Sequence, residues 1–308
     1  MSQPKFRVSK NAPLGLFLRS EPVVKDNTKI AVLPMGHVVA KLAESETAGW
    51  WEVSTTIDGA NIKGFVSSKF LVPNSEFEAP PSQSSLSAVH LHANTPVTRK
   101  QTRWAFALNE AGQPTRNSSS PPNVKAKELG SIIKWLDVQN KARYLPKPSA
   151  TYCNIYGYDY CYLAGVYLPR VWWNNTAIAK LKAGKSVSPI INQTVSEIRA
   201  NGLFDWLREH GLTFGWRRSF NNLTELQNAA NDGQVVVILA QHKIPNLSGH
   251  IAVVAPETST QKALRNGSTL IRPLQSQAGR TNRSYWTPPS WWSNSQKYKD
   301  FGFWINGS

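Results

Sequence analysis

The chain has 308 residues, a net charge of +16 and only two cysteines. This length predicts two hydrophobic cores, and two cysteines exclude a disulfide scaffold or a zinc site built mainly from thiolates. No stretch approaches the ~18 consecutive apolar residues of a membrane-spanning helix, and the first residues lack the apolar core of a secretory signal. We therefore expect no membrane insertion. The expected product is made in the cytoplasm and would reach a target in the periplasm or outside the cell by lysis or a dedicated export system.

Residues 13–73 predict a small all-β domain, because short β-rich segments alternate with turn residues. The segments are 16–19, 29–33, 37–42, 50–55 and 64–65. Several short motifs along them occur in the order typical of the bacterial SH3-like domain, which this region resembles: Arg19-Ser20, Pro34-Met35-Gly36, Gly49-Trp50-Trp51 and Gly64-Phe65-Val66.

This resemblance implies that residues 1–73 form a small barrel that binds the bacterial cell wall. Trp50 and Trp51 are the candidate wall-binding residues. Neighbouring side chains on a strand point to opposite faces, so the alternative is that one of them packs in the core and the other is merely exposed.

Residues 74–124 are interpreted as a linker and irregular segment. The stretch from Asn74 to Asn94 is rich in Pro and Ser and has little periodic hydrophobicity, and residues 113–123 have a similar composition. Whether residues 95–124 belong to the following domain stays open. His90 and His92 lie here, but no acidic or thiol partner is near them in sequence, so we expect no metal site.

Residues 125–308 form the second predicted domain, which begins with an amphipathic helix over 125–141. Most of the positive charge lies in this part: residues 1–95 hold 9 Lys and Arg against 8 Asp and Glu, and the rest holds 26 against 11. Such a field attracts anionic polymers. We do not expect a nucleic-acid partner, because no long basic run and no nucleic-acid motif is present.

Cys153 and His250 are the candidate catalytic pair. A helix is predicted to begin at or just before Cys153, where the helix dipole and free N–H groups favour a thiolate and stabilise an oxyanion. The apolar run 251–254 predicts a buried strand that pairs antiparallel with a strand over 234–240, which puts His250 at a strand's leading end. A cysteine at a helix start, followed by a distant histidine on a sheet strand, is the papain-like order.

The segments Tyr152-Cys153-Asn154 and Gly249-His250-Ile251-Ala252-Val253-Val254 resemble the NlpC-type and CHAP-type cell-wall cysteine peptidases and amidases. The resemblance implies a papain-like α+β hydrolase domain with an antiparallel sheet. Cys153 would be the nucleophile and His250 the base. A third, polar residue would orient the imidazole from the next strand. Gln275 and Gln277 fit this position, with Glu257 as the carboxylate alternative.

The substrate would lie against residues beside the nucleophile and against aromatic rings. Tyrosine and tryptophan faces stack on sugars and apolar stems, although core packing is the simpler explanation for most tryptophans. The candidate substrate-binding residues are Tyr152, Asn154, Trp173, Trp216, Trp291 and Trp292.

The sequence thus favours a peptidoglycan hydrolase, an endopeptidase or amidase, that works through a thioester and needs no metal or organic cofactor. Its expected partners are peptidoglycan, anionic wall polymers and an immunity protein. Two alternatives stay open. One is a cysteine protease, deamidase or transglutaminase-like toxin that acts on proteins, and the other is a cell-wall-binding protein without catalysis.

Overall fold

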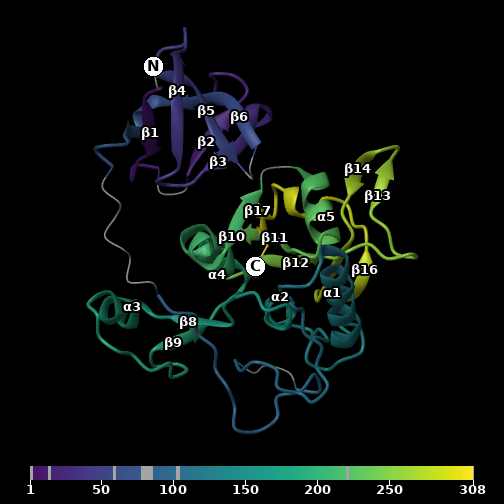
Figure 1. Cartoon of the computed structure of the whole chain (residues 1–308). Helices are drawn as coiled ribbons and strands as arrows, with labels where there is room; N and C mark the ends of the chain where they lie inside the picture. The colour runs from purple at the N-terminus through teal and green to yellow at the C-terminus, as the bar shows by residue number, and fades with distance from the viewer. Residues whose placement is uncertain are drawn as a thin grey trace. The chain divides into compact units, whose positions relative to one another are not determined.

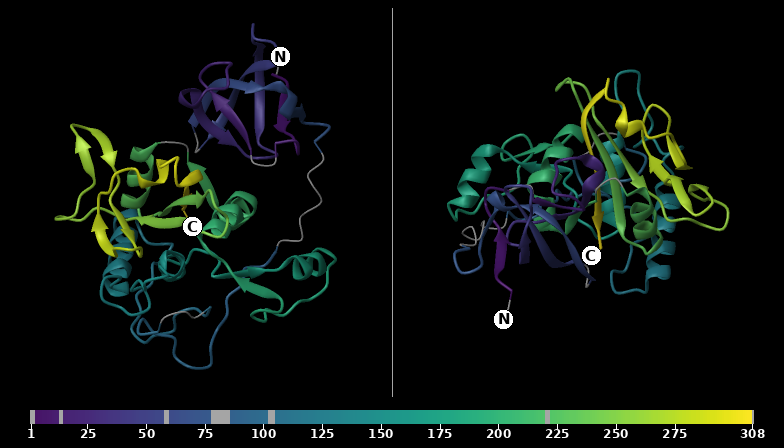
Figure 2. Two further views of the ribbon diagram at one scale, coloured as in Figure 1. Left: turned by 180° about the vertical axis from the view of Figure 1, so that it is seen from behind. Right: turned by 90° about the horizontal axis from the view of Figure 1, so that it is seen from above.

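The computed structural model describes residues 3–12, 15–57, 60–77, 86–101, 105–219 and 222–307. The chain divides into two compact units, residues 1–83 and residues 84–308 (Figures 1 and 2). The first unit is all β, and the second combines helices with antiparallel sheets. The chain as a whole is therefore of the α+β class.

The first unit is a seven-stranded antiparallel sheet in the order β3-β2-β6-β5-β4-β1-β7. The sequence predicts five of these strands, β2 to β6, and does not predict β1 or β7. No ladder between β3 and β7 is found among the residues that are described. The strands are β1 (Lys5–Val8), β2 (Leu16–Arg19), β3 (Lys29–Leu33), β4 (Val38–Glu44), β5 (Trp50–Ile57), β6 (Ala60–Ser67) and β7 (Leu71–Pro73).

The two tryptophans of the first unit differ in their packing. Trp51 lies on the inward face of β5, in line with buried Val53, and packs against the core of this unit. Its ring centroid is 4.7 Å from that of Phe6, and Lys41 Nζ is 4.0 Å from it. Trp50 points to the opposite face and is half-buried.

The second unit is built on a six-stranded antiparallel sheet in the order β10-β17-β11-β12-β15-β16. Two small two-stranded sheets accompany it, and one of them, the β13–β14 hairpin, projects from the unit (Figure 2). The strands are β8 (Val171–Trp173), β9 (Val195–Glu197), β10 (Trp216–Ser219), β11 (Val235–His242), β12 (His250–Val254), β13 (Leu264–Asn266), β14 (Thr269–Arg272), β15 (Gln275–Gln277), β16 (Arg283–Trp286) and β17 (Tyr298–Asn306).

Five α-helices occur in the described part of the second unit, and none of them is both long and apolar enough to cross a membrane. The helix predicted over 125–141 lies a few residues earlier, and the helix predicted at Cys153 begins at that residue. They are α1 (Pro122–Leu136), α2 (Cys153–Leu163), α3 (Asn175–Lys182), α4 (Ala200–Glu209) and α5 (Leu223–Asn231).

Strand β11 is the central element of the sheet and is buried along its whole length. Val237 and Leu239 face the main core, which α2 and α4 share, whereas Val236 and Ile238 face a second cluster formed with α5 and β17 (Figure 1). Other elements cover both faces of β11, so apolar residues follow one another along the strand and do not alternate with polar ones. Its antiparallel pairing with β12 confirms the predicted pair.

Helix α2 packs very closely on β12. A Cβ atom on Gly157 would lie 2.9 Å from Ile251 Cδ1, so only glycine fits without displacement of that side chain. Gly157 is one turn after Cys153, and Ile251 directly follows His250. The contact therefore fixes the distance between the helix start and the strand start that carry the candidate pair.

A buried ion pair fixes the same helix from the other side. Asp159 of α2 accepts hydrogen bonds from Arg143 Nε at 2.6 Å and Arg143 Nη2 at 3.0 Å, and both side chains are fully buried. The hydroxyl of Tyr144 donates a third hydrogen bond to Asp159 at 2.9 Å. This network ties α2 to the segment before it.

Residues 86–124 differ from the predicted linker. Leu86, Val89, Leu91, Val97 and Leu108 are buried in the main core, so this segment belongs to the second unit. Its described residues, 86–101 and 105–121, form no helix or strand before α1, which is why the segment shows no hydrophobic periodicity. Residues 78–85 and 102–104 of the predicted linker lie outside the described residues.

The Arg143–Asp159 pair predicts a large stability difference between two neighbouring variants. Arg143→Ala leaves the Asp159 carboxylate buried without its counterion, and we expect the free energy of unfolding to fall by about 3–5 kcal/mol. Lys141→Ala removes a partly exposed pair with Asp137 and should change it by about 0–1 kcal/mol. Urea titration followed by tryptophan fluorescence measures both, and equal effects would contradict the anchoring role of Arg143.

Candidate functional site

A cleft of about 1110 Å³ lies in the second unit where the starts of α2 and β12 meet. Its lining includes Cys153 and Asn154 from α2, His250 from β12 and Gln277 from β15. The lining also includes residues before α2, α4, β12 and β17 and the segment between β15 and β16. Segments far apart in sequence thus converge on the predicted pair.

Cys153 is the first residue of α2, and its side chain forms part of the cleft. The residue is 3% exposed. Burial raises the pKa of its thiol, while the nearby backbone N–H groups of Ile251, Asn154 and Cys153 itself act in the opposite direction. The same N–H groups are suited to a negative oxygen or sulfur next to the thiol.

His250 and Gln277 form a well-defined hydrogen bond. His250 Nε2 lies 2.6 Å from Gln277 Oε1, and Gln277 Nε2 donates to the backbone oxygen of Thr281 at 3.1 Å. The Thr281 carbonyl can only accept, so it fixes the orientation of the amide and turns Oε1 toward the ring. Nε2 of His250 must therefore carry a proton.

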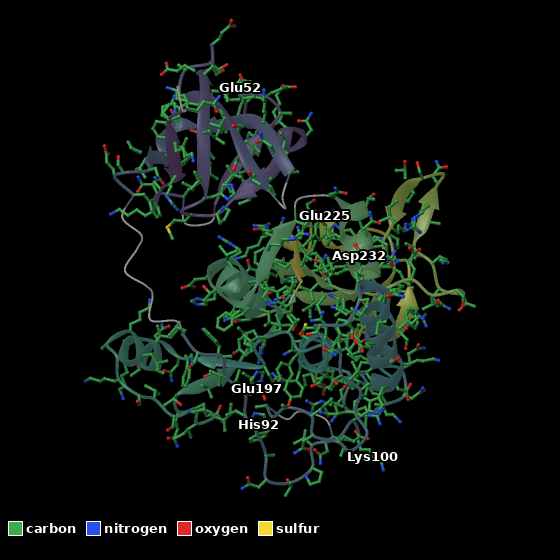
Figure 3. The ribbon with its side chains drawn as sticks, viewed as in Figure 1. Glu52, His92, Lys100, Glu197, Glu225 and Asp232 are labelled. Carbon is green, nitrogen blue, oxygen red and sulfur yellow. The ribbon has the colours of Figure 1, made fainter. Side chains whose placement is uncertain are left out.

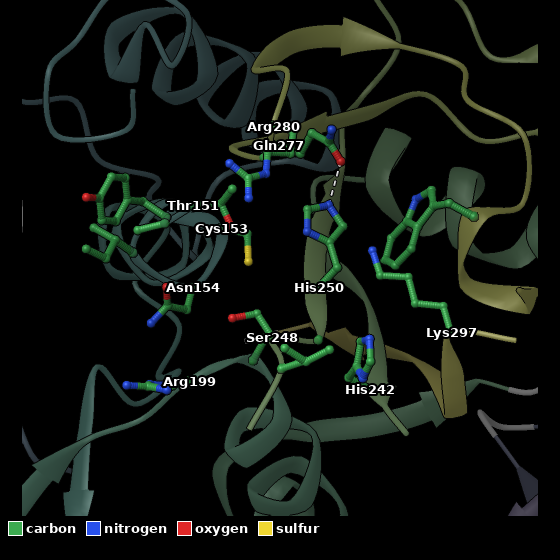
Figure 4. Close-up of a pocket in the computed structure, with 18 of the residues that line it drawn as sticks. Thr151, Cys153, Asn154, Arg199, His242, Ser248, His250, Gln277, Arg280 and Lys297 are labelled. Carbon is green, nitrogen blue, oxygen red and sulfur yellow. Dashed lines mark hydrogen bonds between the residues drawn. The ribbon is translucent and has the colours of Figure 1, made fainter. Parts of the chain in front are cut away.

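The other ring nitrogen of His250, Nδ1, is then the one able to accept a proton. Figure 4 shows the sulfur of Cys153 directed toward this side of the His250 ring. The arrangement is a thiol, an imidazole and an amide in series, in which the amide holds the imidazole in the tautomer that faces the thiol.

The imidazole of His250 is held in place by two further contacts. The Trp291 ring meets it edge to face at a centroid distance of 4.7 Å. A Cβ atom on Gly279 would lie 3.2 Å from Gln277 Nε2 and 3.5 Å from His250 Cε1, so glycine leaves room for the hydrogen-bonded pair. The ring thus has little freedom to turn away from Cys153.

Burial lowers the pKa of His250 to about 4; the hydrogen bond to Gln277 opposes this effect and the positive charge of Lys297 adds to it. Together with the raised pKa of Cys153, this makes both groups neutral at rest near neutral pH. Burial thus favours the neutral thiol and imidazole over a preformed thiolate–imidazolium pair. His250 can act as a general base that takes the thiol proton during attack.

The three candidates for the third residue lie in different surroundings. Gln277 contacts His250 directly, whereas Gln275 Oε1 accepts a hydrogen bond from Trp291 Nε1 at 3.0 Å and so acts on the ring that packs against His250. Glu257 lies outside the cleft and forms an ion pair with Arg265 at 2.6 Å. The structure thus favours Gln277 and separates Glu257 from the site.

The candidate substrate-binding residues are also divided. Tyr152, Asn154 and Trp291 line the cleft. Three tryptophans do not, because they are core residues: Trp173 is 6%, Trp216 1% and Trp292 4% exposed. Their indole rings pack in the two hydrophobic clusters of the second unit, away from the lining of the cleft.

Several cleft residues belong to no motif by which the sequence could identify them. Arg199 and Arg280 come from the segments before α4 and before β16, Lys297 precedes β17, and Ser248 precedes β12. Figure 4 shows them around Cys153 and His250. Each is an isolated residue in a connecting segment, so only the fold brings them together.

In the described parts of the chain no three His, Cys, Asp or Glu side chains gather as metal ligands. His90 Nδ1 lies 3.3 Å from the hydroxyl of Tyr158, and its ring packs against that of Tyr167 at a centroid distance of 5.2 Å. His90 is therefore part of an aromatic cluster behind α2.

The His250 geometry makes a spectroscopic prediction. In long-range ¹H–¹⁵N spectra, the His250 ring should keep the nitrogen shifts of the neutral Nε2–H tautomer down to about pH 4. Lys297→Gln removes a positive charge that disfavours the imidazolium, so it should raise the pKa of His250. The His250→Gln variant assigns the resonance among the six histidines. A ring that titrates near 6.5 as a mixture of tautomers would contradict this geometry.

Comparisons of the chain with protein-family models, with curated proteins and with solved structures found no match. The roles of the residues at this site therefore rest on their geometry and chemistry. In that geometry the thiol of Cys153, at the start of a helix, faces the ring of His250 inside an open cleft. The amide of Gln277 is hydrogen-bonded to the other side of the ring.

Proposed function

We propose that the protein is a cysteine hydrolase that cleaves amide bonds of bacterial peptidoglycan. One observation carries the proposal: Cys153 lies in an open cleft and faces Nδ1 of His250, whose other ring nitrogen is bound by Gln277. A buried structural cysteine needs neither a cleft nor an oriented imidazole. Cys161, which lies two turns further along α2, has neither and is fully buried.

The reaction follows from the positions of these groups. The Cys153 sulfur attacks the amide carbonyl carbon as its proton passes to Nδ1 of His250. The backbone N–H groups at the start of α2 stabilise the oxyanion that forms, and His250 returns the proton to the leaving amine. Water, activated by His250, then hydrolyses the thioester and restores the thiol.

The neutral resting state suits this sequence of steps. A base with a low pKa accepts a proton only transiently, and the hydrogen bond to Gln277 favours the imidazolium that forms. Lys297 favours a charged sulfur but disfavours a charged ring. These two effects of Lys297 oppose each other when the proton passes from Cys153 to His250.

The proposal includes two fold assignments. The second unit would be papain-like, in keeping with a nucleophile at the start of α2 and a histidine at the start of β12. The first unit would be an SH3-like barrel, in keeping with its antiparallel strands and with the order of its Arg-Ser, Gly-Trp-Trp and Gly-Phe-Val motifs. NlpC-type and CHAP-type wall enzymes combine domains of these kinds.

Two features favour a wall substrate. A wall-binding module would hold the catalytic unit on an insoluble polymer and raise its local concentration. The positive charge beyond residue 95 would attract the same anionic mesh. With such a substrate the protein would act at the wall after delivery across the membrane.

The main test is mass spectrometry of muropeptides released from purified sacculi. The parent protein should release defined fragments, and Cys153→Ala should reduce the rate by at least about 10³-fold, because the nucleophile is lost. The matched control is Cys161→Ala, which should keep the parental product pattern. The mass of the new ends identifies the amide that is cut.

Two results would contradict the proposal. Equal clearing of sacculi by the parent and by Cys153→Ala would indicate a wall-binding protein without catalysis. Intact muropeptides alongside a modified protein substrate would indicate a cysteine enzyme that acts on proteins.

The role of Gln277 gives a separate prediction. Gln277→Ala leaves the His250 tautomer unfixed, and we expect kcat/KM to fall by about 10²-fold or more. Glu257→Gln should leave kcat/KM near the parental value, because Glu257 lies outside the cleft. Muropeptide release rates across pH measure both variants. A larger loss in Glu257→Gln than in Gln277→Ala would overturn this assignment.

A further inference from the structure

The cleft around Cys153 and His250 is lined by more basic than acidic side chains. Its lining holds five basic residues, Arg170, Arg199, Arg280, Arg283 and Lys297, and one carboxylate, Glu197. Glu197, which is labelled in Figure 3, forms an ion pair with Arg170 at 3.0 Å, so its charge is already balanced. The other four cations have no carboxylate within ion-pair distance in the described ranges of the chain.

Two of these cations lie on opposite sides of the candidate pair. In Figure 4 the guanidinium groups of Arg280 and Arg199 lie on either side of the line that joins the Cys153 sulfur to the His250 ring. A substrate amide bound between the sulfur and the ring would therefore extend toward one arginine on each side.

Hydrogen bonds connect Arg280, and the residue before Arg199, to the segment that contains Cys153. Arg280 Nη1 donates to the backbone oxygens of Pro148 at 2.7 Å and Lys147 at 3.2 Å, just before α2. Arg199 follows Ile198, whose oxygen accepts a hydrogen bond from Asn154 Nδ2 at 3.0 Å. The start of α2 thus lies between them.

We propose that the substrate carries a free carboxylate on each side of the scissile amide, one bound by Arg280 and the other by Arg199. This inference rests on the proposed function and narrows its substrate class. It favours amides within the acidic peptide stems over the amide that joins stem to glycan.

The chemistry of the two side chains supports this choice. A guanidinium presents paired N–H donors in a plane that match the two oxygens of a carboxylate. A carboxamide has nearly the same shape but no charge, and it points N–H donors at the arginine. Conversion of either carboxylate to an amide therefore removes the attraction and leaves the fit of the peptide unchanged.

The first experiment measures binding without catalysis. Full-length Cys153→Ala is titrated calorimetrically with a purified stem-peptide muropeptide and with the same muropeptide after conversion of its carboxylates to carboxamides with ammonia and a carbodiimide. We expect the carboxylate form to bind at least about tenfold more tightly. Equal affinity for the two forms overturns the inference, whether or not the parent protein hydrolyses either.

The second experiment assigns the two arginines. Muropeptides amidated at only one carboxylate are compared in the Arg199→Gln and Arg280→Gln forms of Cys153→Ala. Each variant should lose the preference at one carboxylate and keep it at the other. The matched control is Lys262→Gln, an exposed cation outside the cleft, which should keep both preferences. An equal loss in all three variants indicates only a general effect of net charge and overturns the assignment.

The third experiment separates this inference from the proposed function. If the parent protein cleaves the carboxylate and carboxamide forms with equal kcat/KM, the hydrolase proposal stands and the carboxylate inference fails. If the parent cleaves neither form but Cys153→Ala retains the binding preference, the hydrolase proposal fails and the anion-binding cleft remains. A preference of about tenfold for the carboxylate form, in both kcat/KM and affinity, supports the hydrolase proposal and the carboxylate inference together.

Discussion

The candidate site depends on the close contact between Gly157 of α2 and Ile251 of β12. Packed side chains cannot shift continuously, so this contact holds the helix and the strand at one separation. Cys153 lies one turn before the glycine, and His250 lies one residue before the isoleucine. The geometry of the thiol and imidazole is thus set by an apolar contact beside them. The buried Arg143–Asp159 pair connects the same helix to the segment before it.

Much of this arrangement can be predicted from the sequence, because its strongest signals are local. The apolar run of β11, the shorter run of β12 and the helix after Cys153 all follow from hydrophobic pattern. The residue that orients His250 cannot be predicted in this way, because Gln275 and Gln277 are two positions apart and share a face of β15. The register of β15 against β12 and the irregular pairing with β16 decide which of the two reaches His250.

Other features could not be predicted for identifiable reasons. Residues 86–124 have the composition of a linker, but isolated apolar residues such as Val89 and Val97 still fill gaps in the core. Trp173 and Trp216 are buried although aromatic residues are also typical of sugar-binding grooves. The cations of the cleft come from separate connecting segments, and no sequence pattern links Arg199 with Arg280.

The neutral resting state of Cys153 affects how readily its sulfur is oxidised. Peroxide and disulfides react with a thiolate far faster than with a thiol, so a nucleophile that is ionised at rest is also the cysteine most easily oxidised. Here Cys153 is 3% exposed and burial raises the pKa of its thiol. A cysteine that loses its proton only when a carbonyl lies against it is protected from sulfenic acid formation between turnovers. For the hydrolase proposed above, this would slow oxidation of the nucleophile if the enzyme acts outside the cell, where no cellular reductant reaches it.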